Sequence, residues 1–200
     1  MTLTNEYQYV GRSNAVKDQN GKYSYYILLY AKTSPDEATG RHRVSVKQRL
    51  VGTNVFYGYS TSGSISIAGT EASQWSWAIV PGGNWNLSNV TEGGVTYARG
   101  VDLKEGTVEI NAGYGTEKSI QISASWRFES GSAGYLPQTA VTATVTGTVT
   151  LPVIYGASTI TAVAEATLGF ACNVKWTPRT AAMRYKLKFA VGEWSHTTGV

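Results

Sequence analysis

The stretch from Thr139 to Tyr155, TAVTATVTGTVTLPVIY, constrains the fold of this chain more than any other stretch. From Val141 to Leu151, small or apolar residues alternate with threonine at every second position. Side chains on a β-strand point to opposite faces with a period of two, so this pattern predicts a long strand with one buried and one solvated face. Pro152 has no N–H group to donate to a neighbouring strand, and we therefore expect the strand to end at Leu151.

The Leu151–Pro152 break also predicts a division of the chain into two parts. We expect residues 1–151 to form one β-sandwich domain and residues 152–200 to begin a second domain. An immunoglobulin-like domain needs about seven strands and about 100 residues, which is more than the segment after Tyr155 provides. We expect this second domain either to be truncated or to be completed by strands of another chain.

Two further runs show the same alternation. In Arg41–Val51, one face carries His42, Val44, Val46, Gln48 and Leu50. In Ser119–Phe128, the residues expected to point inward are Ile120, Ile122, Ala124, Trp126 and Phe128. With the turn-rich composition, these runs predict about nine strands before Pro152 joined by short turns. The predicted fold class is all-β: an antiparallel β-sandwich of jelly-roll or immunoglobulin-like type, followed by a partial immunoglobulin- or fibronectin-like domain.

Other segments give less regular patterns. Tyr23–Lys32 is apolar on both faces, which predicts a strand that is covered on both sides or that presents one face to a partner. Gly63 divides two short predicted strands, Val55–Ser60 and Ser64–Ala68. Trp75–Val80 is predicted to be a strand, and Asn84–Gly100, rich in glycine and asparagine, to be a loop.

The residues that enzymes commonly use are scarce. The two histidines, His42 and His196, lie in different predicted domains, and the single cysteine, Cys172, is predicted to be a small buried residue of a strand. No phosphate-binding loop or nucleophile elbow occurs, and one cysteine with two distant histidines matches no zinc-site spacing. We expect no enzyme activity, no cofactor and no metal site.

The best candidate ligand site is a group of aromatic residues: Trp75, Trp77, Trp85, Tyr57 and Tyr59. Sugar rings stack on flat aromatic side chains, and the asparagines near Trp85 can hydrogen-bond to sugar hydroxyls. The alternative is that Trp75 and Trp77 belong to the hydrophobic core, where aromatic residues bury large areas.

A second candidate surface is the other face of Arg41–Val51, which carries a row of cations: Arg41, Arg43, Lys47 and Arg49. Arginine is suited to phosphate oxygens, so this row is a candidate contact for anionic wall polymers such as teichoic acid. The alternative is a solvated sheet face that opposes aggregation. The net charge of +4 is small and no nucleic-acid-binding motif occurs, so we expect no nucleic-acid partner.

The sequence also bears on the compartment. The first residues, MTLTNEYQYVGRS, lack the features of a signal peptide, and the longest apolar run is far too short to span a membrane. One cysteine allows no intrachain disulfide. We expect no membrane insertion.

The segment that follows the Leu-Pro junction resembles a module of tail-associated structural proteins from siphophages and prophages of Gram-positive bacteria. In those proteins a junction of the form TLP-x-I-x-R-A-S leads into repeated immunoglobulin-like domains. The matching residues here are Thr150–Pro152, Ile154, Ala157–Ser158, Thr167–Gly169, Cys172–Pro178, Lys186–Phe189 and Trp194. Gly156 replaces the arginine of the junction, and Tyr23–Val51 and Phe56–Gly69 resemble the N-terminal domain of the same proteins.

This resemblance implies a virion structural protein of the tail tip or tail fibre, assembled in the bacterial cytoplasm and released by lysis. It implies no reaction, and it implies other virion subunits, including further copies of the chain in a homo-oligomer, as partners. Host cell-wall polysaccharide or teichoic acid is the candidate receptor. The alternative function is a carbohydrate-binding module of a bacterial surface protein or wall hydrolase. The resemblance also implies that related proteins continue beyond the position of Val200, which favours truncation of the second domain.

Overall fold

The computed structural model describes residues 1–53, 60–78, 89–130, 137–156, 159–164, 173–177, 186–191 and 193–199, with the backbone alone at 60–61, at 75–78 and from 159 onward. Within these ranges the chain consists of strands, turns and irregular segments, without a helix. The strands form antiparallel sheets that are packed together, which confirms the predicted all-β fold and is consistent with a β-sandwich. The finer assignment to a jelly-roll or immunoglobulin-like type stays a prediction.

The first sheet has the strand order β1-β3-β4-β9, with the short β2 also paired to β3. Its strands are β1 (Gln8–Arg12), β2 (Val16–Lys17), β3 (Ser24–Asp36), β4 (Arg41–Gly52) and β9 (Arg99–Asn111). β3 and β4 pair without a register shift along their whole length. The five residues predicted to share one face of β4 are all buried: His42, Val44, Val46, Gln48 and Leu50.

The second sheet has the strand order β11-β10-β5-β6. Its strands are β5 (Ser60–Ile67), β6 (Thr70–Ala78), β10 (Lys118–Phe128) and β11 (Val141–Leu151). β11 begins and ends where the alternation of the sequence begins and ends, and its apolar positions from Ala143 onward lie on the core side. The five inward residues predicted for β10 are all buried.

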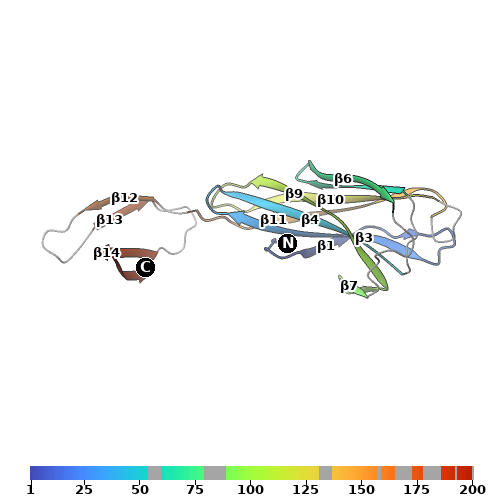
Figure 1. Ribbon diagram of the computed structural model, residues 1–200, viewed down its shortest axis with the longest axis horizontal. Helices are drawn as coiled ribbons and strands as arrows, with labels where there is room; N and C mark the ends of the chain where they lie inside the picture. Colours follow the sequence, from blue (N-terminus) through green and yellow to red (C-terminus); the bar gives the residue numbers. More distant parts are fainter. Residues whose placement is uncertain are drawn as a thin grey trace.

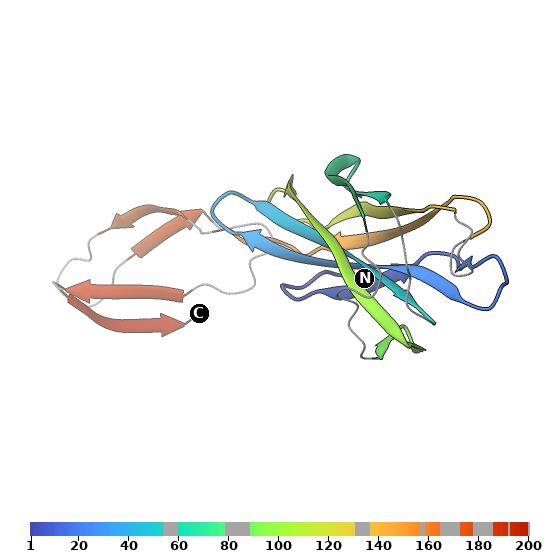
Figure 2. The ribbon, with the colours of Figure 1, turned by 45° about the vertical axis from the view of Figure 1, so that its right-hand side comes forward.

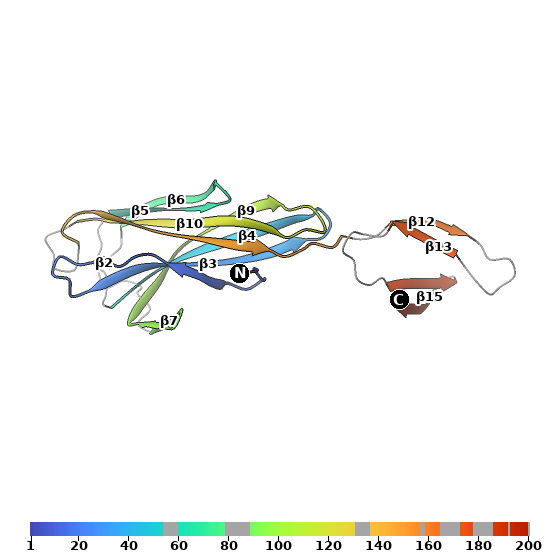
Figure 3. The same cartoon turned by 180° about the vertical axis from the view of Figure 1, so that it is seen from behind.

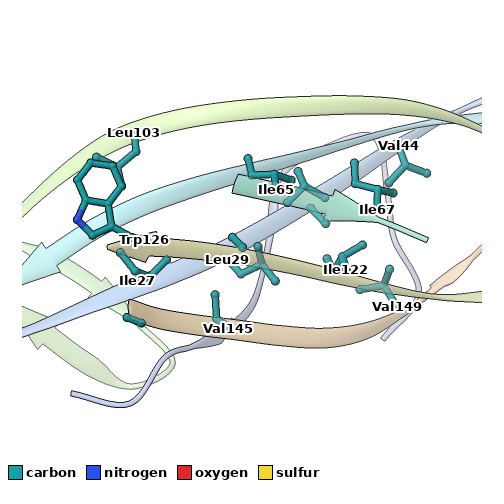
Figure 4. Packing of buried hydrophobic residues seen from close by; sticks show 14 of the residues in the cluster. Ile27, Leu29, Val44, Ile65, Ile67, Leu103, Ile122, Trp126, Val145 and Val149 are labelled. Atoms are coloured by element: carbon teal, nitrogen blue, oxygen red, sulfur yellow. The ribbon is translucent and has the colours of Figure 1, made fainter. Parts of the chain in front are cut away.

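The core of the molecule lies between these two sheets. Side chains from β3, β4 and β9 meet side chains from β5, β10 and β11 in one cluster, as Figure 4 shows for the labelled residues. The same layered arrangement is visible along the long axis in Figure 1 and from behind in Figure 3. Trp126 is fully buried in this cluster.

Two predictions about strands are wrong. β5 runs through Gly63 instead of being divided by it, because Gly63 keeps its place in the register between Trp126 of β10 and Trp75 of β6. Part of the predicted loop Asn84–Gly100 forms a hairpin of β7 (Val90–Glu92) and β8 (Val95–Tyr97). The turn is possible because Gly93 and Gly94 both adopt positive φ, a conformation that other residues rarely reach.

The residues after Pro152 form two separate antiparallel pairs. β12 (Thr159–Ala164) pairs with β13 (Asn173–Thr177), and β14 (Lys186–Val191) pairs with β15 (Glu193–Gly199). The division into domains at residue 151 stays a prediction.

Candidate functional site

The predicted row of cations lies on the outer face of the first sheet, where β9 supplies carboxylates opposite it. Arg49 Nε is 2.5 Å from Asp102 Oδ1, and Lys47 Nζ is 3.4 Å from Asp102 Oδ2. Arg41 Nη1 is 3.4 Å from Glu109 Oε2, in a pair in which both side chains are largely exposed. Three of the four cations are thus ion-paired within the sheet, and Arg43 is exposed beside them. This arrangement weakens the attraction that the row can exert on a distant anion.

Arg49 and Asp102 each stabilise the charged form of the other. Partial burial raises the pKa of Asp102, but the hydrogen bond and charge of Arg49, with the charge of Lys47, outweigh burial, so that the net pKa is lowered. The hydrogen bond to Asp102 likewise raises the pKa of Arg49. Both groups are charged at neutral pH, and the pair belongs to the structure of the sheet face.

Next to this row lies a tyrosine cluster that the sequence did not reveal. Tyr30 and Tyr97 are buried with Leu28 and Val51, and they are packed against Tyr7, Tyr9 and Tyr26. Tyr9 meets Tyr30 edge-on at 5.9 Å between ring centres, and Tyr26 meets Tyr97 at 5.5 Å. Figure 2 shows how the long green strand β9 leads away from the small β7–β8 hairpin, whose residues Val90, Val95 and Tyr97 join the cluster.

Cations of the row stack on these rings. Lys47 Nζ lies 4.7 Å from the ring centre of Tyr7, and the Arg49 guanidinium lies 5.5 Å from that of Tyr30. Burial and the nearby charge of Glu105 raise the pKa of Tyr7, while burial and Glu92 raise that of Tyr30. The hydroxyl groups of Tyr7 and Tyr30 are buried, and the carboxylates of Glu105 and Glu92 lie near them. The second face of β3 is therefore covered by other parts of the same chain.

His42 has a structural role, as its place among valines predicted. The ring is fully buried, and Nε2 donates to the carbonyl oxygen of Pro152 at 3.0 Å. Nδ1 is 3.0 Å from the hydroxyl of Thr33 and accepts a hydrogen bond from it, because the carbonyl fixes the tautomer of the neutral ring. Burial lowers the pKa of His42, against a smaller opposite effect of the Pro152 hydrogen bond, so the ring is neutral at pH 7.

The structure describes only the backbones of two of the five aromatic candidates. Trp75 and Trp77 lie in β6, where their backbones pair with Gly63 and Thr61. Their side chains, together with Trp85, Tyr57 and Tyr59, lie outside the described residues, and so does Cys172. The choice between sugar platform and core stays open for these residues.

The outer face of the second sheet contains a groove that the sequence did not single out. Its volume is about 570 Å³, and its lining comes from all four strands of the sheet: Ser62, Gly63, Ser64, Gln74, Ser125, Arg127 and Thr142. The hydroxyl oxygens of Ser64 and Ser125 are 2.9 Å apart across the β5–β10 pair. Arg127 Nε donates to Glu129 Oε1 at 2.7 Å, so the one cation of the lining is ion-paired at its edge.

The chemistry of this groove is that of hydroxyl, amide and guanidinium groups. Most pockets for drug-like ligands are lined by apolar side chains, whereas the side chains here are polar and belong to a sheet face of serine and threonine. A polyhydroxylated ligand can exchange hydrogen bonds with such a lining. The alternation of the sequence places Ser125, Arg127 and Thr142 on outward faces, but it does not show that β5 lies beside β10.

Within the described residues, no group of three or more histidine, cysteine or acidic side chains is arranged to hold a metal ion. No helix that could span a membrane occurs in that part of the chain. Comparisons with protein-family models, with curated proteins and with solved structures find no match to this chain.

Proposed function

We propose that this chain is a non-catalytic structural protein of a phage or prophage tail, at the tail tip or in a fibre, and that it binds host cell-wall glycans or neighbouring virion subunits. The virion assignment rests on the resemblance of the Leu-Pro junction and of the segments on both sides of it. In this proposal residues 152–200 belong to an immunoglobulin-like repeat.

The polar groove on the β5–β6–β10–β11 face carries the binding part of the proposal. It has the volume of a site for a short oligosaccharide, and its lining groups are hydrogen-bond donors and acceptors. The basic row is the second candidate contact, for teichoic acid, and its most exposed members are Arg41 and Arg43.

The test is sedimentation of the purified chain with Gram-positive cell walls, before and after removal of teichoic acid. Ser64→Trp fills the groove, and we expect it to weaken binding at least about tenfold, which corresponds to about 1.4 kcal/mol. Gln121→Ala is the matched control, since Gln121 lies on the outward side of the same strand as Ser125 but outside the groove. This control should bind like the unaltered chain.

Two results would redirect the proposal. If Arg41→Ala with Arg43→Ala abolishes binding, and removal of teichoic acid does the same, then the basic row and not the groove is the receptor site. If the chain binds no wall preparation at high concentration, the receptor role fails and a scaffolding role in the virion is left.

The alternative is a carbohydrate-binding module of a bacterial surface protein or wall hydrolase. The polar groove fits this alternative equally well, so wall binding cannot separate the two. Flanking genes can: tape-measure and holin genes favour the tail protein, and genes for exported hydrolases favour the module.

A further inference from the structure

β11 is an edge strand, and the direction of its backbone groups can be assigned. Thr150 N donates to Met1 O at 2.8 Å, and Leu3 N donates to Thr150 O at 2.9 Å, so both groups of Thr150 point away from β10. In an antiparallel pair, every second residue directs both backbone groups to the same side. The residues of β11 that share the direction of Thr150 are Thr142, Thr144, Thr146 and Thr148.

Within the described residues, Met1–Leu3 is the only segment paired with this edge, and it reaches only Thr150. The rest of the edge lacks the charges, prolines and bulges that prevent edge strands from pairing with other chains. From Val141 to Thr148 it has no charge and no proline, and its pairing with β10 has no bulge. The edge strands of the first sheet differ, because β1 contains a bulge after Tyr9 and β9 carries several charged residues.

We propose that this edge pairs with the same edge of a second copy of the chain, antiparallel, around a two-fold axis at Val145. Thr144 then lies opposite Thr146 of the second copy, and Thr142 lies opposite Thr148. Each of these pairs exchanges both backbone hydrogen bonds. The two four-stranded sheets become one continuous sheet across the axis.

The position of the axis follows from the bounds of β11 and from the backbone groups of Thr150, which are already hydrogen-bonded. An axis shifted to Thr146 would bring Thr142 opposite Thr150, whose backbone groups Met1 and Leu3 already occupy. An axis shifted to Thr144 would bring Thr148 opposite Ala140, which precedes the strand. Only the axis at Val145 gives each of the four threonines a partner that lies inside β11 and has unpaired outward backbone groups among the described residues.

The side chains of β11 are compatible with this pairing. On the outer face each threonine meets a threonine, a pair that can hydrogen-bond across strands. On the core side Val145 lies opposite Val145 of the second copy, and Val141, which is 37% exposed in the single chain, lies at the end of the paired region, before Met1 takes over the edge beside Val149. No charged residue lies opposite another charge in this register, which suits self-association.

This inference goes beyond the proposed function, because self-association is a property of the purified chain and requires neither a glycan nor a virion. The chain should be produced without an N-terminal extension. Met1–Leu3 runs parallel to β11, so that added residues would extend along the edge under test.

Thr144→Pro removes one outward N–H group and leaves the bonds to β10 in place, since edge strands tolerate proline on their open side. Thr144→Val keeps the N–H group and is the matched control. We expect sedimentation velocity to show a concentration-dependent dimer for the unaltered chain and for Thr144→Val, and a monomer for Thr144→Pro with an unchanged circular dichroism spectrum.

The register is tested by disulfide formation between exposed positions, in a Cys172→Ser background. A chain with Thr142→Cys alone, or with Thr148→Cys alone, should form no disulfide, because the same position in the two copies lies far apart in this register. A mixture of the two variants should form a disulfide, since position 142 of one copy faces position 148 of the other at a Cα separation of about 5.5 Å. This test does not depend on the folding of the proline variant. A chain that stays monomeric at all concentrations overturns the proposal, and so does a dimer that forms without the mixed crosslink.

Discussion

Gly147 shows at the scale of one residue why the alternation of β11 contains a glycine. A Cβ atom built at this position would collide with Cγ1 of Val10, which enters from the other sheet. Val10 is partly buried against the core cluster. The missing side chain on β11 therefore makes room for a side chain of β1.

Gly147→Ala is expected to lower the free energy of unfolding by about 1–3 kcal/mol, the usual cost of overpacking a core. The backbone of Gly147 does not have positive φ, so the loss would come from the collision and not from the backbone. The measurement is urea unfolding followed by tryptophan fluorescence.

A double variant separates the collision from other causes. In a chain that already carries Val10→Ala, the added Gly147→Ala should cost much less than it does alone. Equal costs in both backgrounds would show that Val10 and Gly147 do not compete for the same space.

The alternation of the sequence predicted the buried faces of the strands well, but not the partners of the outer cations. It placed His42 inside and Arg41, Arg43, Lys47 and Arg49 on the opposite face, because two-residue alternation is a local property. It could not place Asp102 beside Arg49, since the pairing of β4 with β9 joins positions far apart in the sequence.

At the scale of the elements, a side chain of β4 is hydrogen-bonded to the residue that directly follows β11. His42 of β4 hydrogen-bonds to the carbonyl of Pro152, which directly follows β11. A neutral buried imidazole thus links the first sheet to the segment that follows β11.

The stability of this link should depend on pH. Burial lowers the pKa of His42 below its ordinary value of 6.5, so the unfolded chain binds a proton more readily than the folded chain. The contribution of the neutral His42 ring to the free energy of unfolding is complete above about pH 6.5 and is lost as the pH falls below that value. We expect the melting temperature to fall between pH 7.5 and pH 5.5 for the unaltered chain, and to fall less for His42→Gln.

His196 is present in both proteins, so its titration cancels in the comparison. Parallel curves for the two proteins over this interval would contradict a buried, neutral His42.

Two features were not predicted from the sequence, each for a different reason. The β7–β8 hairpin is short, and its turn, Gly93–Gly94, resembles loop sequence. A Cβ atom at Gly93 would lie 2.9 Å from the Tyr9 ring, so the turn is fitted against β1. The groove depends on the strand order β11-β10-β5-β6, and alternation within single strands does not encode that order.

At the scale of the whole molecule, the two sheets present outer faces of different character. The first carries tyrosines, stacked cations and carboxylates that largely satisfy one another. The second carries serine and threonine hydroxyls, a polar groove and an uncharged edge. The second face is therefore where the proposed contacts with glycans and with another copy of the chain are concentrated.

The central proposal is that this chain belongs to a phage tail, and immunogold electron microscopy tests it most directly. An antibody against the chain would be applied to particles released by prophage induction from the bacterium that encodes it. The proposal predicts label at the end of the tail or on its fibres. Particles with intact tails that carry no label, with the chain found instead at the bacterial surface, would contradict it.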